Sequence, residues 1–225
     1  MRIVLLFIAS FLFCKLTYAE NAWELSGYGA FNLNSQANYR LFSSGNDIVY
    51  DASGRPSGAF GLEADRSFTK IFWLGFILDE TYFASNEVSG TDSQLSILLM
   101  PKIKVDLDPR FKFWAGLGFG TANTSFGTTR TEPNAVFKMS SRSTSSFAIS
   151  PRIGLDYAWN ESFFTGLQLG FLANTASNAE ASASGTSANG TFRADVQHSF
   201  WSLGIRLGFI LKDKIQTEEE ATDSF

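Results

Sequence analysis

The sequence contains one histidine, His198, and it lies directly before a serine, Ser199. A histidine that contacts a serine hydroxyl can take its proton, which is the basis of nucleophilic hydrolysis. Neighbouring side chains of a β-strand, however, point to opposite faces. We therefore expect no catalytic pair, no enzyme, and a rim position for His198. No phosphate-binding loop or metal-ligand spacing is present either, so we expect no cofactor and no metal.

Ten charged residues could form a second kind of site, because they all fall on one face of the alternating segments described below. This predicted lumen network comprises Glu24, Glu63, Asp65, Asp79, Asp156, Lys102, Lys104, Lys112, Arg152 and Arg206. An unpaired buried charge costs several kcal/mol, so five groups of each sign indicate pairing. The pairs could plug an interior or line a narrow polar conduit, and we favour the plug.

The N-terminus has the features of a secretory signal peptide. Arg2 supplies a positive charge, and residues 3–13 form an apolar run too short to span a bilayer. Small residues at Thr17 and Ala19 predict cleavage after residue 19. Cys14 raises a lipoprotein alternative, which the bulky Phe13 before it disfavours.

Composition narrows the class of protein. Removal of residues 1–19 would remove the only cysteine, Cys14, and with it any disulfide. It would also remove Arg2 and Lys15, which lowers the formal net charge from −4 to about −6. An acidic chain without a basic stripe argues against nucleic acid as a partner. No remaining segment has 18 consecutive apolar residues, so we expect no transmembrane helix.

Eight segments alternate apolar residues with small or charged ones. They are 23–33, 58–65, 69–82, 94–105, 111–121, 147–159, 163–173 and 201–211. Strand side chains have a period of two, and a transmembrane strand needs about 9–11 residues. Segment 69–82 is apolar on both faces at its start, so its phase is the least defined. The second face is rich in Gly, Ser and Ala, which is typical of a narrow lumen rather than of a soluble β-sandwich, the alternative fold.

The links between these segments alternate between short and long. Short links fall near 66–67, 106–109 and 160–162, and long polar links span 35–56, 84–93, 122–145 and 174–198. Tight periplasmic turns and longer extracellular loops produce this pattern, and both termini are then periplasmic. Aromatic residues near the short links predict an interfacial girdle. The girdle comprises Trp23, Phe111, Phe113, Tyr157, Trp159, Phe163 and Phe209.

These features predict an all-β fold, a transmembrane antiparallel up-and-down barrel of about eight strands. Its glycine-rich strands, such as Trp114 to Gly120, resemble those of the small OmpA, OmpX and OmpW type outer-membrane barrels. We expect a signal peptide at 1–19, a barrel at 20–211 and an acidic periplasmic tail at 212–225. The resemblance implies contact with outer-membrane lipid and lipopolysaccharide, and insertion by the barrel-assembly machinery. We expect a monomer. Family members usually end on a terminal aromatic strand, whereas here a polar tail follows Leu211.

Three functions fit this architecture. The first is a structural or surface-interaction role, through loops whose basic and aromatic residues suit anionic sugars or lipid phosphates. These loop residues are Tyr39, Arg40, Phe42, Tyr50, Phe126, Arg130, Phe137, Lys138, Arg142 and Arg193. The second is a narrow channel or transporter for small polar or apolar solutes. The third and weakest is a lipid-modifying enzyme. Fold alone does not choose among them.

Overall fold

The chain is described by a computed structural model, which covers residues 22–42, 48–85, 89–132, 135–139, 144–185 and 190–212. The predicted signal peptide and all of the predicted tail except Lys212 lie outside these residues. None of the described residues belongs to a helix long and apolar enough to cross a membrane.

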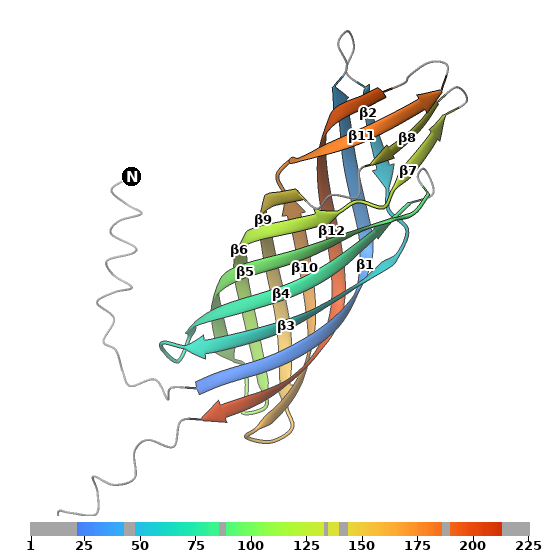
Figure 1. Cartoon of the computed structure of the whole chain (residues 1–225). Coiled ribbons are helices and arrows are strands. Elements are labelled where there is room, and N and C mark those ends of the chain that lie inside the picture. The colour runs from blue at the N-terminus through green and yellow to red at the C-terminus, as the bar shows by residue number, and fades with distance from the viewer. Residues whose placement is uncertain are drawn as a thin grey trace, which may run out of the picture.

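Eight long antiparallel strands close into a barrel (Figure 1). They are β1 (Ala22–Phe42), β3 (Ser57–Ser67), β4 (Phe72–Ala84), β5 (Thr91–Asp106), β6 (Phe111–Ser125), β9 (Thr144–Ala158), β10 (Phe163–Asn174) and β12 (Gly190–Lys212). Each strand pairs with the next around the ring, and β12 closes it by pairing with β1. The predicted fold class is therefore confirmed.

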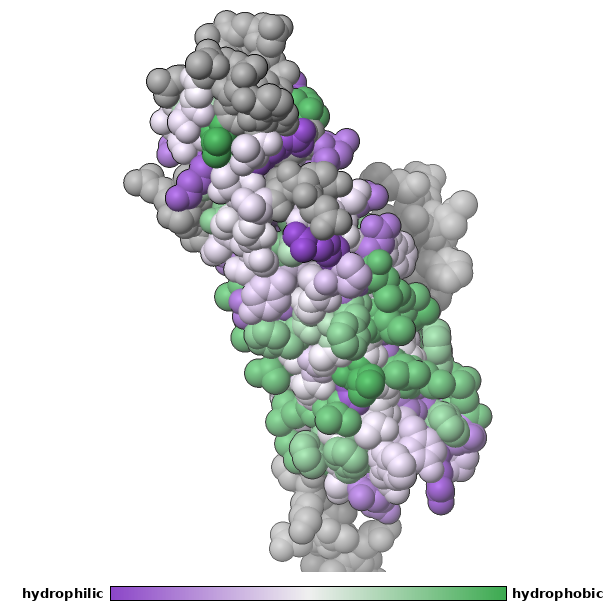
Figure 2. All heavy atoms as spheres, turned by 90° about the vertical axis from the view of Figure 1, so that its right-hand side faces the viewer, coloured by the Kyte–Doolittle hydropathy of each residue, from purple (hydrophilic) through white to green (hydrophobic). Residues whose placement is uncertain are grey.

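The period-two pattern places apolar side chains outside and small or charged ones inside. The outward residues form an apolar belt, which includes Leu25, Phe31, Phe60, Leu62, Phe76, Leu95, Leu99, Ile103, Phe119, Ile149, Ile153, Leu167, Ile205 and Leu207, all exposed. Figure 2 shows these hydrophobic surfaces gathered around one part of the barrel, with more polar surface beyond it. A soluble monomer rarely exposes an apolar patch of this size. The belt is therefore the surface that faces lipid. The undefined phase of β4 is resolved, with Phe72, Phe76 and Leu78 outward and Trp73 and Ile77 inward.

The strands meet in tight turns at one end of the barrel, called the turn end. Ala22 and Lys212 are paired there, so both strand termini lie at this end. Two turns are capped by side chains: Asp108 Oδ1 accepts from the amide of Phe111 at 2.9 Å, and Asn160 Oδ1 accepts from the amide of Phe163 at 2.8 Å. The third turn spans 68–71, because β3 continues through the residues where the sequence suggested a link.

The opposite end, called the extended end, continues well beyond the apolar belt. Three of the four long links predicted as loops contain further strands: β2 (Ile48–Ser53), β7 (Thr129–Glu132), β8 (Ala135–Met139) and β11 (Ser177–Gly185). Together with β1 and β12 they give the strand order β2-β1-β12-β11-β8-β7, the tall part of Figure 1. The Ala- and Ser-rich stretch at 181–190, within the last of the long links, alternates with period two in β11, where Ala181 and Ala183 are buried. Residues 186–189 of that stretch lie outside the described residues.

A β-bulge in β1 separates its two halves. Asn32 pairs with Ser202 and Asn34 pairs with Trp201, so Leu33 is the extra residue. The odd positions of β1 therefore face outward before the bulge and inward after it. The switch carries Tyr39 into the interior, although uninterrupted alternation from Trp23 would point it outward.

Candidate functional site

A buried ionic network fills the lumen near the turn end. The structure brings together Glu24, Glu63, Asp65, Asp79, Asp156, Lys102, Lys104, Arg152 and Arg206 on inward positions of six strands. None of them is more than 5% exposed, so the network is shielded from water as well as from lipid.

Lys102 and Arg206 lie at the centre of the network. Lys102 forms ion pairs with Glu63 and with Asp65, whose carboxylate is 3.0 Å from its ammonium. Arg206 donates to Glu63 at 2.7 Å and to Asp156 at 3.2 Å. These are charge-assisted bonds across the barrel, and they link β3, β5, β9 and β12.

Lys104 extends the network toward the turn end. Its ammonium pairs with Glu24 and lies 2.9 Å from Asp65 Oδ2. It also lies 4.1 Å from the centre of the Trp73 ring, which places a cation over an aromatic face.

Arg152 forms a second cluster toward the extended end. It pairs with Asp79 and donates to the hydroxyl of Tyr28, and its guanidinium lies 5.2 Å from the centre of the Tyr28 ring. A third bond, from Nε to Ser150 Oγ at 3.0 Å, orients the guanidinium from its own strand. The sequence identified both charges, but Tyr28 had no signal except its inward phase.

Trp114 is wedged among the charges. Its ring centre lies 4.6 Å from the Lys102 ammonium and 4.6 Å from the Arg206 guanidinium. The indole is fully buried, and it fits because Gly154 faces it across β6 and β9: a Cβ there would lie 2.4 Å from the ring. The glycine-rich inner face therefore makes room for large side chains, as a closed small barrel requires.

Lys112 is the one predicted network residue that the structure leaves apart. It is half-buried beside Asp156 in the β6–β9 register, and within the described part of the chain it makes no ion pair. Lys112 is the second residue of β6 and therefore lies at the turn end of the lumen. Water can solvate its ammonium there.

His198 is buried, which corrects the rim position expected from the sequence. It is 2% exposed, and Nε2 lies 3.1 Å from Asp92 Oδ2. The same oxygen accepts from the Tyr39 hydroxyl at 2.9 Å. Phe83 and Phe200 lie at ring-centre distances of 5.2 and 5.9 Å from the imidazole. Sequence reasoning missed this cluster because β12 is longer than its apolar segment and because the β1 bulge determines where Tyr39 points.

Asp92 organises the backbone around this histidine cluster, which we define as His198, Asp92 and Tyr39. Its second oxygen accepts from the amides of Gly127 at 2.9 Å and Thr128 at 3.1 Å. The carboxylate thus ties the chain after β6 to β5, β1 and β12. The cluster lies inside the barrel, on the extended side of the ionic network.

Besides Tyr39, two of the residues predicted to make contacts from the loops lie inside the barrel rather than on its surface. Phe126 and Phe137 are buried in the extended end, and Arg40, Lys138 and Arg193 are exposed. Arg130 is half-buried. The Tyr50 side chain and Arg142 lie outside the described residues.

The predicted aromatic girdle lies on the outer face at the turn end. Tyr157 packs edge-on against Phe111 and Trp159, with ring centres 5.0 Å apart in both pairs, and Phe163 contacts Phe209 at 5.5 Å. Trp23 lies under the guanidinium of Arg66. The last member, Phe113, is exposed at the same end. Aromatic rings in this position suit a membrane–water interface.

Within the described residues, no group of three or more His, Cys, Asp and Glu side chains is arranged to hold a metal ion.

Sequence comparison finds no protein-family model and no curated protein that matches the chain. Solved structures do match. The outer membrane protein OprG of Pseudomonas aeruginosa has a TM-score of 0.52 at 16% identity, over 85% of this chain and 96% of that chain. The outer membrane protein AlkL, solved in lipid bilayers, has a TM-score of 0.51 at 13% identity, over 89% of this chain and 95% of that chain.

The similar structures also include an enzyme, the outer membrane protease OmpT of Escherichia coli, with a TM-score of 0.49 at 7% identity, over 85% of this chain and 98% of that chain. Identities this low concern the fold alone, and a fold does not determine an activity. In fold, this chain is a small outer-membrane β-barrel, closed by eight antiparallel strands.

Proposed function

We propose that this protein presents an interaction surface at the outside of the outer membrane, on a barrel whose lumen is closed to solutes. The main observation that supports this proposal is the packed ionic network. Lys102, Asp65 and Arg206 are each at most 1% exposed, so no water-sized path reaches them from either end. A half-paired network would be costly, whereas the pairing found here lets the charges act as a plug.

The strand connections support an orientation. Tight turns are typical of the periplasmic side, and longer extensions of the extracellular side. We place the turn end, with both strand termini, in the periplasm. The extended end then faces the cell exterior, where its strands project beyond the apolar belt.

The surface feature with the clearest ligand chemistry is an arginine pair around Phe42. The guanidinium of Arg40 lies 5.1 Å from the centre of the Phe42 ring, and that of Arg193 lies 5.5 Å from it. Both arginines are exposed, and the ring holds two planar, permanently charged donors on one face of β1 and β12. Sulfate, phosphate or carboxylate groups of an anionic polysaccharide suit such donors.

We infer that the chain is not an enzyme. His198 faces inward onto Asp92, and Ser199 faces outward, so the only histidine and its neighbouring serine do not meet. The imidazole is enclosed by aromatic rings rather than open to a substrate.

Planar-bilayer recording of the refolded protein tests the closed lumen. We expect a silent membrane, and Arg206→Ala in the plug should add at most brief, noisy openings. Steady unitary steps from the wild type would instead favour a channel, the alternative function.

Binding to immobilised heparin tests the surface role. Because a charge-assisted contact contributes roughly 1.5–3 kcal/mol, the double variant Arg40→Ala/Arg193→Ala should weaken retention on the order of tenfold or more. Arg66→Ala is the matched control, since Arg66 also lies over an aromatic ring but at the turn end. Equal retention by both variants would contradict the assigned surface.

A further inference from the structure

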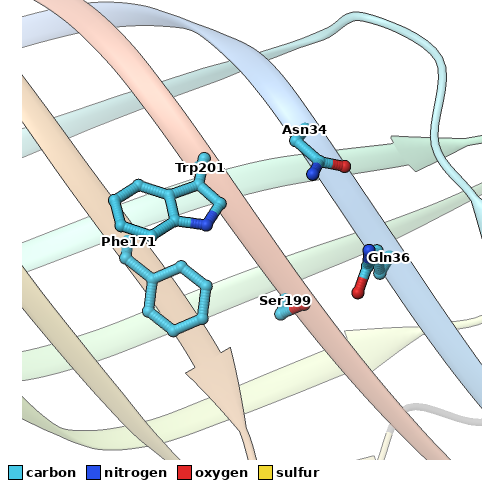
Figure 3. A pocket seen from close by; sticks show the side chains of 5 residues that line it. All are labelled: Asn34, Gln36, Phe171, Ser199 and Trp201. Carbon is cyan, nitrogen blue, oxygen red and sulfur yellow. The ribbon is translucent and has the colours of Figure 1, made fainter.

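A hollow lies on the outer wall of the barrel, just beyond the apolar belt toward the extended end. It has a volume of about 240 Å³ and is lined by Asn34, Gln36, Phe171, Ser199 and Trp201 (Figure 3). The residues come from β1, β10 and β12 and all point away from the lumen. The closed interior and the arginine pair are separate from it.

The hollow follows from two rungs of the sheet. On the lower rung Asn34, Trp201 and Phe171 are cross-strand neighbours, and on the upper rung Gln36 lies beside Ser199. Ser199 is small, so the large Trp201 beneath it forms a wall and the space above the serine stays empty. The β1 bulge at Leu33 turns both amides toward this space, because without the extra residue they would face the lumen.

The lining combines an aromatic platform with neutral polar groups. The rings of Phe171 and Trp201 lie 4.9 Å apart at 44°, which leaves indole surface exposed beside the amides. Neither Asn34 nor Gln36 bonds to any other side chain that the structure describes, so their donors and acceptors are available to a ligand. No charged side chain lines the hollow.

This composition selects a class of ligand. An alkyl chain would leave two amides without partners, which is costly once water is displaced. A phosphate would find no cation. A sugar ring satisfies both halves, because its C–H face packs on an indole and its hydroxyl or amide groups reach Asn34 and Gln36.

We propose that the hollow binds a hexosamine ring of the glycolipid in the outer leaflet, the lipid A part of lipopolysaccharide, through the C–H face and the neutral polar groups of the ring, with the phosphates of the glycolipid outside the hollow. We choose this ligand because of the position of the hollow. The hollow begins where the apolar belt ends, and the headgroup sugars of the glycolipid lie at that depth. This placement rests on the orientation proposed above, with the extended end outside. Bound there, the sugar would anchor one glycolipid beside the β1–β12 seam.

The test titrates the folded protein in detergent micelles with lipid A and follows occupancy by native mass spectrometry. Phosphatidylglycerol and soluble N,N′-diacetylchitobiose are the comparison ligands. Ser199→Leu fills the hollow, and Asn34→Leu/Gln36→Leu removes the amides. Thr121→Leu is the matched control, because it adds the same side chain at the belt edge of β6, on the opposite wall.

We expect Ser199→Leu and the double variant each to weaken lipid A binding on the order of tenfold, with Thr121→Leu unchanged. Competition by the disaccharide would support recognition of the sugar without its acyl chains. If the disaccharide does not compete but both hollow variants still weaken lipid A binding, the acylated sugar is required. Unchanged lipid A binding in both hollow variants would overturn the proposal, as would equal loss of phosphatidylglycerol, which means acyl-chain recognition.

Gel mobility of unheated samples confirms that each variant is folded, and the double variant remains decisive if Ser199→Leu does not fold. The measurement of lipid A binding depends neither on the proposed orientation in the membrane nor on a ligand at the arginine pair. Failure of heparin binding and failure of lipid A binding are therefore distinguishable.

Discussion

Single lumen residues are held by partners on several strands, so each charge depends on the others. Arg206 shows this most clearly, because its guanidinium contacts Glu63, Asp156 and Ser26 from β3, β9 and β1. Removal of Arg206 leaves Asp156 buried without a counter-ion and leaves Glu63 with Lys102 alone. The cost of that is larger than the net contribution of the intact pair.

Arg206→Ala should therefore lower the free energy of unfolding by about 3–5 kcal/mol, the usual cost of breaking a buried pair. Urea unfolding in lipid vesicles, followed by tryptophan fluorescence, measures it. Lys112→Ala is the control, since Lys112 is half-buried and unpaired within the described residues, and we expect a change below about 1 kcal/mol. Similar losses in both variants would argue against a coupled network.

Asp92→Ala should loosen the chain that follows β6. The carboxylate accepts from two amides as well as from Tyr39 and His198, so its loss leaves Gly127 and Thr128 without an acceptor. Hydrogen exchange at these two amides should accelerate on the order of tenfold or more. Asp51→Ala, which removes only an exposed bond to Asn38, should leave both rates unchanged.

At the scale of the elements, the bulge in β1 decides which residues face the lumen in the extended end. It inserts Leu33 without a partner on β12, and the residues on either side of it resume regular pairing. Bulges serve this purpose in many sheets, since they re-aim the side chains that follow. Here the result is an inward Tyr39 and outward amides on the same strand.

Deletion of Leu33 should be tolerated, because Asn32 and Asn34 already pair with consecutive residues of β12. The variant should keep its folded gel mobility and a melting temperature near that of the wild type. Deletion of Gly29 is the contrasting control, since it would shift the outward Phe31 into the lumen phase and should abolish folding. A Leu33 deletion as damaging as the Gly29 deletion would show that the bulge itself is required.

At the scale of the whole molecule, the apolar belt and the girdle define a membrane zone, and the unequal ends define a direction. The turn end has short connections, whereas the strands of the other end continue past the belt as a paired sheet (Figure 1). Such a sheet holds exposed residues in fixed relative positions, which flexible loops do not.

Cysteine labelling of intact cells tests this direction. Ser53→Cys lies in β2 at the extended end, and Lys70→Cys lies in the turn between β3 and β4; both positions are exposed. A membrane-impermeant maleimide should label position 53 on whole cells, and position 70 only after the outer membrane is permeabilised. The reverse pattern would refute the proposed orientation and with it the external surface.

The eight membrane strands were predictable from the sequence, because lipid outside and a narrow lumen inside impose a period of two. Their faces were predictable too, except in β4, whose first residues are apolar on both faces. Tight turns were predictable for the same local reason, since residues such as Asp108 and Asn160 cap the amides just after them. The inward charges share that phase, so the members of the network were identifiable without their partners.

The partners themselves were decided only by the tertiary structure. Arg206 meets Glu63 across 143 positions of the chain because barrel closure and register bring β12 and β3 to the same depth, and no local pattern specifies register. The strands of the extended end lie outside lipid, so they alternate small residues with polar ones. Such a pattern predicts a loop rather than a membrane strand. One unpaired residue, Leu33, then reverses the phase of β1, which is why the histidine cluster and the outer hollow appear only in the folded chain.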